Sequence, residues 1–138
     1  MATTKRPLQV ERRIAVQTYD IDFAQIVHNI VYIRWLEDLR LQLLAETMPM
    51  ESLLALGISP ILTKTEIEYR LPVRLGDRPL GRMWVSELGR TRWTVQAEIV
   101  VEERLAAVAT QQGYFTQIET QRPVRVPAAL RQMWEAAS

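Results

Sequence analysis

One segment with helical periodicity is set among segments that alternate with a period of two. From Asn29 to about Glu46, apolar residues recur at spacings of three, four and seven, which is typical of an amphipathic α-helix. Segments that alternate as β-strands do are residues 10–18, 61–71, 80–88, 93–101 and 105–118. Short turns join the last four of them, which favours an antiparallel sheet. The sequence therefore predicts an α+β fold of order β-α-β-β-β-β, with one long helix against one sheet.

The long helix is expected to be nearly enclosed by this curled sheet. Asn29 is predicted as its N-cap, because an asparagine oxygen can accept a hydrogen bond from a free N–H of the first turn. Arg34 and Asp38 are predicted to form an i,i+4 ion pair on the side opposite the apolar stripe. A short second helical turn is expected at residues 51–56, between Pro49 and Gly57.

Length and termini fit a single domain. A chain of 138 residues can bury a core without covalent staples, so we expect one domain over residues 1–138. Residues 1–9 are expected to be a polar tail, and residues 128–138 a short C-terminal helix after Pro123 and Pro127 end the last strand. Neither a signal peptide nor an apolar stretch of membrane-spanning length is found, so we expect a cytoplasmic protein without a membrane partner.

Composition argues against several classes of function. The chain has no cysteine and one histidine, which excludes disulfides and thiolate chemistry and argues against a zinc site. Its 17 basic and 16 acidic residues leave a formal charge of +1, so no overall field would attract nucleic acid. Any anionic ligand must be bound by a local cluster of basic residues.

Two carboxylates lie between the first strand and the long helix, in an otherwise apolar stretch. Asp20 and Asp22 would be partly desolvated there, while the helix N-terminus offers unpaired N–H groups and positive potential to a developing oxyanion. These components suffice for attack on an activated carbonyl, directly or through water. Spacing alone also fits aspartates that cap a helix or form a turn.

The residues around these carboxylates resemble a known family. The run Tyr19-Asp20-Ile21-Asp22, followed by a Val-x-Asn-x-x-Tyr segment that begins at Val27, resembles the start of hotdog-fold acyl-CoA thioesterases of the 4-hydroxybenzoyl-CoA thioesterase-like group. Later segments that match in order are residues 69–72, 76–77 and 122–127. The resemblance implies a hotdog fold, in which a five-stranded antiparallel sheet wraps around one long central helix. It also implies hydrolysis of an acyl thioester to a carboxylic acid and a thiol.

The resemblance assigns roles near the helix start. Asp22 would be the catalytic carboxylate, acting as nucleophile or general base, and backbone amides around His28 and Asn29 would polarise the carbonyl, while Asp20 would be structural. His28 could also form a dyad with Asp22. The Asp-x-Asn-Pro-x-His arrangement of hotdog hydratases is absent, however, so we favour a position lining the helix entrance.

Five further residues are expected to bind substrate by the same resemblance: Gln25, Val27, Tyr32, Arg90 and Arg92. Gln25 stands where the CoA enzymes usually have glycine, which alters how closely the loop backbone approaches the acyl group. In CoA-type relatives, basic residues near the turn between the third and fourth strands contact the nucleotide phosphates. Arg90 falls at that turn, and an arginine fork suits phosphate.

Two alternatives stay open. The stretch also resembles plant acyl-acyl carrier protein thioesterases, which share the following residues with this chain: Asp22, Gln25, Val27, Asn29, Tyr32, Ile33 and Trp35. Those enzymes have Asn and His where this chain has Ala24 and Ile26, which favours the CoA-type reading. A non-catalytic acyl-CoA-binding module is the alternative from a different class.

Partners and assembly follow from the same reading. The substrate is expected to be an acyl-CoA or a carrier-protein thioester, and no metal or redox cofactor is implied. An edge strand and an apolar face would be left unprotected in one copy, so we expect a homodimer or homotetramer with a continuous sheet and a site between subunits. Trp84 and Trp93 would belong to the core, to an oligomer interface or to the wall of an acyl pocket.

Overall fold

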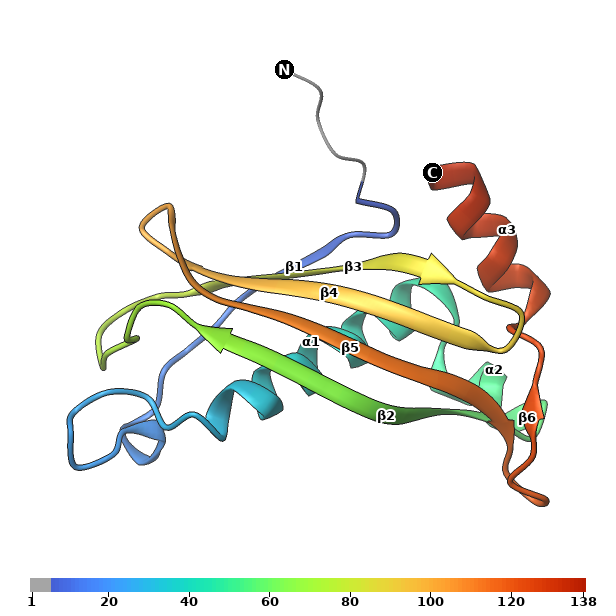
Figure 1. Cartoon of the computed structure of the whole chain (residues 1–138), viewed down its shortest axis with the longest axis horizontal. Helices are drawn as coiled ribbons and strands as arrows, with labels where there is room; N and C mark the ends of the chain where they lie inside the picture. The colour runs from blue at the N-terminus through green and yellow to red at the C-terminus, as the bar shows by residue number, and fades with distance from the viewer. Residues whose placement is uncertain (1–5) are drawn as a thin grey trace.

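The structure, a computed structural model, describes residues 6–138 and contains one antiparallel sheet crossed by one long helix (Figure 1). The strands are β1 (Val10–Arg13), β2 (Ile58–Tyr69), β3 (Leu80–Leu88), β4 (Arg92–Val101), β5 (Arg104–Gln117) and β6 (Pro123–Val124). Their order is β1-β3-β4-β5-β2, and β6 pairs with β5. The helices are η1 (Thr18–Asp20), α1 (Val31–Thr47), α2 (Met50–Ala55) and α3 (Ala128–Ala137). The predicted α+β architecture is confirmed.

Helix α1 packs on one face of the sheet with a stripe of apolar side chains. Tyr32, Leu36, Leu39 and Leu43 follow the i, i+4, i+7, i+11 spacing of one helix face and are buried. Burial of each such side chain contributes about 1.5–3 kcal/mol. The helix is less enclosed within one copy than predicted, because the sheet covers its apolar stripe and leaves another side open. Ile33 on another side of the helix is 47% exposed.

The start of α1 differs from the prediction. The helix begins at Val31 with Ile30 as its N-cap, and no side chain caps it, so the assignment of Asn29 as N-cap is wrong. The predicted Arg34–Asp38 pair is replaced by a contact between Arg34 and Asp20. A buried carboxylate attracts the guanidinium more strongly than a solvated one does on the helix surface.

Two strands also differ from their predicted patterns. β1 ends at Arg13, because the chain then turns through η1 instead of continuing to residue 18. In β2 a bulge between Leu62 and Lys64 interrupts the pairing with β5. One extra residue shifts the side-chain alternation, so the faces change along the strand. β6 was not predicted, since proline donates no ladder hydrogen bond and is tolerated only at such edges.

The segment before β1 packs on the sheet instead of forming a free tail. Pro7 is buried and its carbonyl accepts a hydrogen bond from the Val85 N–H at 3.0 Å, while the first five residues lie outside the described part of the chain. Arg6 and Arg82 both contact the Glu98 carboxylate, at 2.7 and 3.2 Å. Burial alone raises the pKa of Glu98, but these hydrogen bonds outweigh it and hold the pKa below its ordinary value of 4.5. Among residues 6–138, the helices are all too short or too polar to cross a membrane.

Glu98→Gln should lower stability at pH 7 by about 1–2 kcal/mol, because charged hydrogen bonds from two arginines are lost. A carboxylate with a depressed pKa stabilises the fold fully above its unfolded pKa, and the contribution is lost as pH falls through the folded pKa. The difference between wild type and variant should therefore shrink at pH 3. Urea unfolding at both pH values measures it, with the exposed Glu87→Gln as control. An equal difference at the two pH values would contradict this role.

Candidate active site

Asp22 lies in a tight loop between η1 and α1. The Asp22 N–H donates to the Ile26 carbonyl at 2.9 Å, the Gln25 N–H donates to the Asp22 carbonyl at 2.9 Å, and Ile21 and Val27 form an isolated β-bridge. The Asp22 carboxylate is half-buried, and its Oδ1 accepts hydrogen bonds from Ala24 N–H at 2.9 Å and Ile26 N–H at 3.4 Å. Its Oδ2 forms no hydrogen bond within residues 6–138. One oxygen thus fixes the side chain while the other stays free.

Asp20 anchors this loop from beneath. It is 1% exposed, and its Oδ1 accepts a hydrogen bond from Arg34 of α1 at 2.5 Å while its Oδ2 accepts one from the Gln17 N–H at 2.9 Å. Its backbone carbonyl accepts the His28 N–H at 2.9 Å. Asp20 therefore ties together both ends of the loop and the first turn of α1. Sequence reasoning missed Arg34 here, because no local pattern relates residues fourteen positions apart.

The N-terminus of α1 presents unpaired backbone donors beside the loop. The His28 N–H is used by Asp20, whereas the N–H groups of Asn29 and Ile30 form no hydrogen bond with any described residue. The Asn29 carbonyl accepts a hydrogen bond from the Tyr69 hydroxyl at 2.9 Å, which fixes this peptide against β2. The His28 side chain is exposed and forms no hydrogen bond to Asp22 in the described structure. The available donors are thus Asn29 and Ile30 instead of His28.

Val27 and Tyr32, two of the expected substrate contacts, are buried. The Val27 N–H donates to the Val73 carbonyl at 2.8 Å, and the Tyr32 ring packs edge-on against Tyr69 with centroids 5.0 Å apart. Burial and the neighbouring Tyr69 raise the pKa of Tyr32 to about 12, although a backbone hydrogen bond at Val73 opposes the rise. Tyr32 is therefore neutral at physiological pH. Both residues support the loop from the core.

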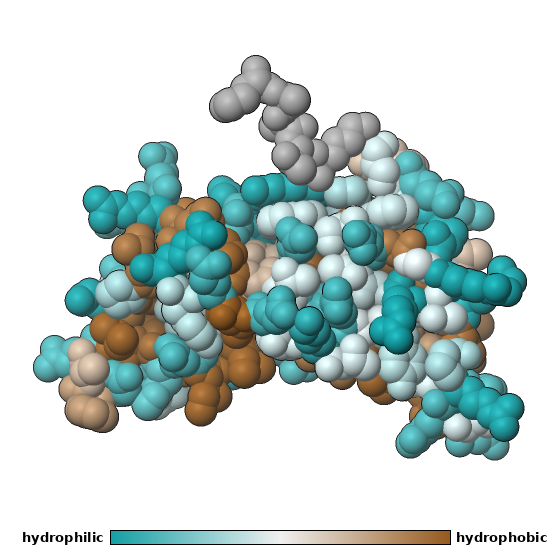
Figure 2. Space-filling model, viewed as in Figure 1, coloured by the Kyte–Doolittle hydropathy of each residue, from teal (hydrophilic) through white to brown (hydrophobic). Residues whose placement is uncertain are grey.

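Exposed apolar side chains surround the Asp22 loop. Phe23 is fully exposed, Ile30 is 75% exposed, and Tyr69 at the end of β2 and Leu71 and Leu75 after it are also exposed. Figure 2 shows hydrophobic residues gathered at this end of the molecule. Within one copy, the apolar side chains beside this loop therefore stand open to solvent.

Arg90 lies in a hollow at the β3–β4 turn. Two other arginines, which sequence analysis did not place near Arg90, share this hollow. Arg125 and Arg131 line the same hollow, because the Val126 N–H donates to the Arg90 carbonyl at 2.9 Å and Arg131 donates to the Gly89 carbonyl. Arg92, the other expected phosphate contact, is exposed at the start of β4 and is not among the lining residues. The hollow and the Asp22 loop lie at opposite ends of the sheet (Figure 1).

Across residues 6–138, no three acidic, histidine or cysteine side chains are grouped so as to hold a metal ion. Comparison with protein families gives a match over residues 16–133 to the thioesterase-like superfamily. The chain belongs to this superfamily. Comparison with curated proteins found no sequence match.

Solved structures share the fold of this thioesterase-like chain. A thioesterase from Thermus thermophilus, complexed with coenzyme A and Zn, is 22% identical with a TM-score of 0.78, and 92% of each chain is covered. A DHNA-CoA thioesterase from Staphylococcus aureus is 19% identical with a TM-score of 0.81, over 94% of this chain and 87% of the other. A hypothetical protein, also from Thermus thermophilus, is 22% identical with a TM-score of 0.84, over 93% and 98%. The predicted hotdog fold is confirmed, and family and fold together support thioester hydrolysis as the general reaction.

Gln25 adopts a backbone conformation that suits glycine in this thioesterase-like loop. Its φ is +65°, in the left-handed region that costs an L-residue about 1–2 kcal/mol. The glycine expected here by resemblance would avoid that cost. The exposed Gln25 side chain extends from the turn that also holds Asp22, so loop geometry is kept at the expense of strain.

Gln25→Gly should raise the free energy of unfolding by about 0.5–1 kcal/mol, which is the strain relieved less the extra backbone entropy that glycine loses on folding. Gln25→Ala keeps the Cβ and serves as the matched control, with no gain expected. Urea unfolding curves of the three proteins provide the measurement. A glycine variant no more stable than the alanine variant would show that the conformation carries no strain.

Proposed function

We propose that this protein is an acyl-CoA thioesterase that hydrolyses an acyl thioester to a carboxylic acid and a thiol, with Asp22 as its reactive carboxylate. The observation that carries the proposal is a combination of two features. The Asp22 side chain is fixed with one oxygen free, and the Asn29 and Ile30 N–H groups at the start of α1 have no hydrogen-bond partner among the described residues. Family membership supplies the class of reaction. The coenzyme A bound by the Thermus thermophilus thioesterase supports a CoA-type ligand.

The two groups have complementary parts in the reaction. The free oxygen of Asp22 either attacks the thioester carbonyl, forming a mixed anhydride that water then hydrolyses, or takes a proton from the water that attacks. In both routes the carbonyl oxygen gains negative charge, which the Asn29 and Ile30 N–H groups and the positive end of the α1 dipole stabilise. The C–S bond then breaks, and the sulfur leaves as a thiolate that is protonated. Asp20 and Arg34 keep the loop in place throughout.

The arginine hollow favours CoA over a carrier protein. Arg90, Arg125 and Arg131 form a compact basic cluster on a chain whose formal charge is only +1. A small cluster suits the phosphates of one nucleotide, whereas an acidic carrier protein needs a broad basic surface. The carrier-protein thioesterase stays the second candidate, supported by the resemblance of the stretch from Asp22 to Trp35.

A second copy of the chain would bring together the two ends of the sheet, which hold the arginine hollow and the Asp22 loop. β2 is an edge strand, and exposed Ile61 and Leu62 lie along it. Ile33 and Glu37 share a side of α1 with Arg40, which reaches toward β2 through Gln111 and Thr65. Antiparallel pairing of β2 with its own copy would continue the sheet and bring the arginine hollow of one copy toward the Asp22 loop of the other. We therefore propose a homodimer with shared sites, or a tetramer made of such dimers.

Asp22→Asn should reduce turnover at least a hundredfold, the lower end of what a positioned acid or base contributes. The amide oxygen can still accept the Ala24 N–H, so the fold should persist. Thiol release from a panel of aliphatic, aromatic and β-keto acyl-CoAs provides the measurement. Asp20→Asn is the matched control: it should cost far less activity, but about 2 kcal/mol of stability because a charged buried hydrogen bond is lost. Full activity in Asp22→Asn would overturn the assignment, and no turnover by wild type would favour a binding module.

Light scattering at micromolar concentration should give at least twice the chain mass of 16.0 kDa. Ile33→Asp should shift the protein toward single copies, because it buries a charge in the proposed interface. Met133→Asp on α3 is the control, since Met133 is similarly exposed, at 40%, but lies away from β2. A wild-type mass near that of one chain, or an equal effect of both variants, would contradict this interface.

A further inference from the structure

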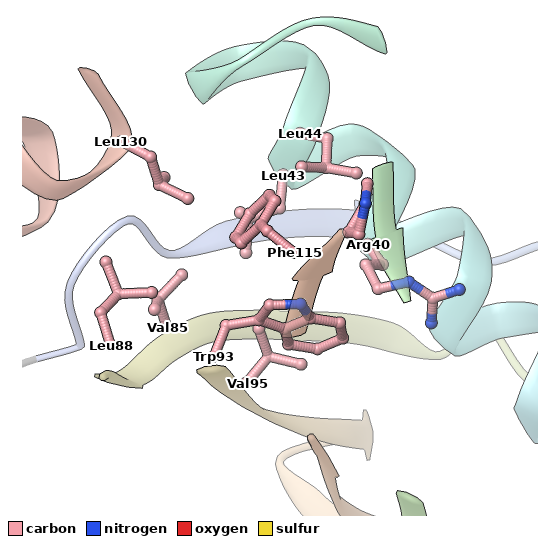
Figure 3. A pocket seen from close by; sticks show the side chains of 10 residues that line it. Arg40, Leu43, Leu44, Val85, Leu88, Trp93, Val95, Phe115 and Leu130 are labelled. Carbon is pink, nitrogen blue, oxygen red and sulfur yellow. The ribbon is translucent and has the colours of Figure 1, made fainter. Parts of the chain in front are cut away.

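An apolar chamber lies between the C-terminal half of α1 and the sheet (Figure 3). It is bounded by α1, by the helix-facing sides of the strands and by α3. Its walls include Leu43, Leu44, Pro60, Val85, Phe115 and Leu130. The proposed mechanism, which uses Asp22 and the arginine hollow, leaves this chamber without a role.

Trp93 gives the chamber a single unsatisfied donor. The residue is 6% exposed, and its Nε1–H is buried and lacks a hydrogen-bond partner among residues 6–138. Figure 3 shows the ring nitrogen on the edge of the indole that faces Phe115 across the chamber. A buried donor without an acceptor costs about 1–3 kcal/mol, so a fold retains one only where something else compensates. The position of the nitrogen indicates an occupant that supplies an acceptor.

Gly113 of β5 allows the indole to lie where it does. Trp93 and Gly113 are directly opposite on β4 and β5, and a Cβ at position 113 would lie 2.5 Å from the Cζ2 atom of Trp93. The same Cβ would overlap the backbone carbonyl of Ile61. The indole therefore sits flat on a position without a side chain, and the packing fixes which way its nitrogen points.

The lining side chains offer no acceptor to the Trp93 donor or to a water molecule bound at it. Buried waters ordinarily make about three hydrogen bonds, and the chamber side chains offer donors but no acceptor. Arg40, the other polar residue at the wall, already donates to Gln111 at 2.9 Å and lies 3.6 Å from Glu37. Burial lowers the pKa of the Arg40 guanidinium, and Glu37 opposes that change. A carboxylate would lose its hydration in this apolar space, so an uncharged acceptor suits the chamber better.

We propose that the chamber binds an apolar group that carries one uncharged acceptor oxygen, such as a ketone, ether or hydroxyl, which accepts the Trp93 Nε1 hydrogen bond. The part of the chamber with room for water-sized molecules is about 30 Å3, so a larger occupant must displace a wall. The proposal places this displacement at Leu130 on α3, a helix that is held by the Trp134 hydrogen bond to the Val85 carbonyl at 2.9 Å and by Arg131. The source of such a group is either a free molecule or the far end of a bound acyl chain.

Indole N–H signals in a 1H–15N spectrum of the whole protein test this proposal without any turnover. The chain has four tryptophans, and the Trp93 signal is the one lost in Trp93→Phe. Cyclohexanone should shift this signal saturably, whereas cyclohexane and cyclohexanecarboxylate should leave it nearly unchanged. Leu130→Phe, which fills the chamber and keeps the indole, should abolish the shift. No saturable shift with cyclohexanone, or the same shift with cyclohexane, would overturn the proposal.

Affinity measurements and an acyl-CoA pair then distinguish the two sources. Trp93→Phe should weaken cyclohexanone binding roughly 2- to 12-fold, the factor that corresponds to one net hydrogen bond. If the chamber takes the end of the acyl chain, the same variant should lower kcat/KM for 7-oxo-octanoyl-CoA by a similar factor and leave octanoyl-CoA unchanged. If the ratio of kcat/KM for the two substrates is unchanged in Trp93→Phe, the group that binds in the chamber belongs to a free molecule. Absence of turnover on both substrates would refute the proposed function, while the cyclohexanone titration still decides the chamber.

Discussion

Helix α1 packs on one face of a single sheet, and the described chain supplies no second layer for its other side. The apolar stripe of α1 fills the concave face of the sheet, so the core is closed in that direction. What stays open is the side of α1 beside β2, together with the edge of β2 itself. A sheet edge and an apolar helix side left exposed together are surfaces that proteins usually cover. The position of the candidate site beside these surfaces follows from this one constraint.

In the proposed function, Asp22 both forms the turn and supplies the reactive carboxylate. The Oδ1 atom of Asp22 accepts backbone N–H groups, as in any turn, and this contact orients the second oxygen. Asp20 performs the purely structural task below it, because its carboxylate is buried and fully engaged. In the proposed mechanism, two neighbouring carboxylates thus have different tasks, since Asp20 holds the loop and Asp22 faces the substrate. Unpaired N–H groups at the α1 start complete the arrangement without any side-chain cap.

Sequence reasoning predicted the elements better than the contacts between them. The bounds of β3 and α3 match the prediction, since alternation, glycine and proline mark them locally. The pairing of Asp20 with Arg34, the missing cap at Asn29 and the bulge in β2 were not predicted. Each of these three features depends on which residues, distant in sequence, are buried nearby. Spacing along the chain does not indicate this. The arginines around Arg90 were found only in part for the same reason, because Arg125 and Arg131 come from another segment.

Trp84 and Trp93 lie on neighbouring strands, but their side chains lie on opposite faces of the sheet. Trp84 lies on the outer face, where the Arg6 guanidinium stacks over it at 4.2 Å, whereas Trp93 faces the helix and lines the chamber. Of the three roles left open for them, Trp93 therefore combines core packing with the wall of a cavity. The same helix-facing side holds Gln111, which joins Arg40 to Thr65. Polar and apolar groups on this face are thus both organised around α1.

Gly113 carries a consequence for how tolerance to mutation should be interpreted in this chain. Any side chain there must push aside both the Trp93 ring and the Ile61 backbone, and backbone in a paired strand yields little. A saturation screen scored by activity would therefore report position 113 as intolerant, just as it would Asp22. The two positions differ in kind, since one loses chemistry in a folded protein and the other loses the folded protein. Abundance measured beside activity would separate them, and the same comparison would sort every other sensitive position on this sheet.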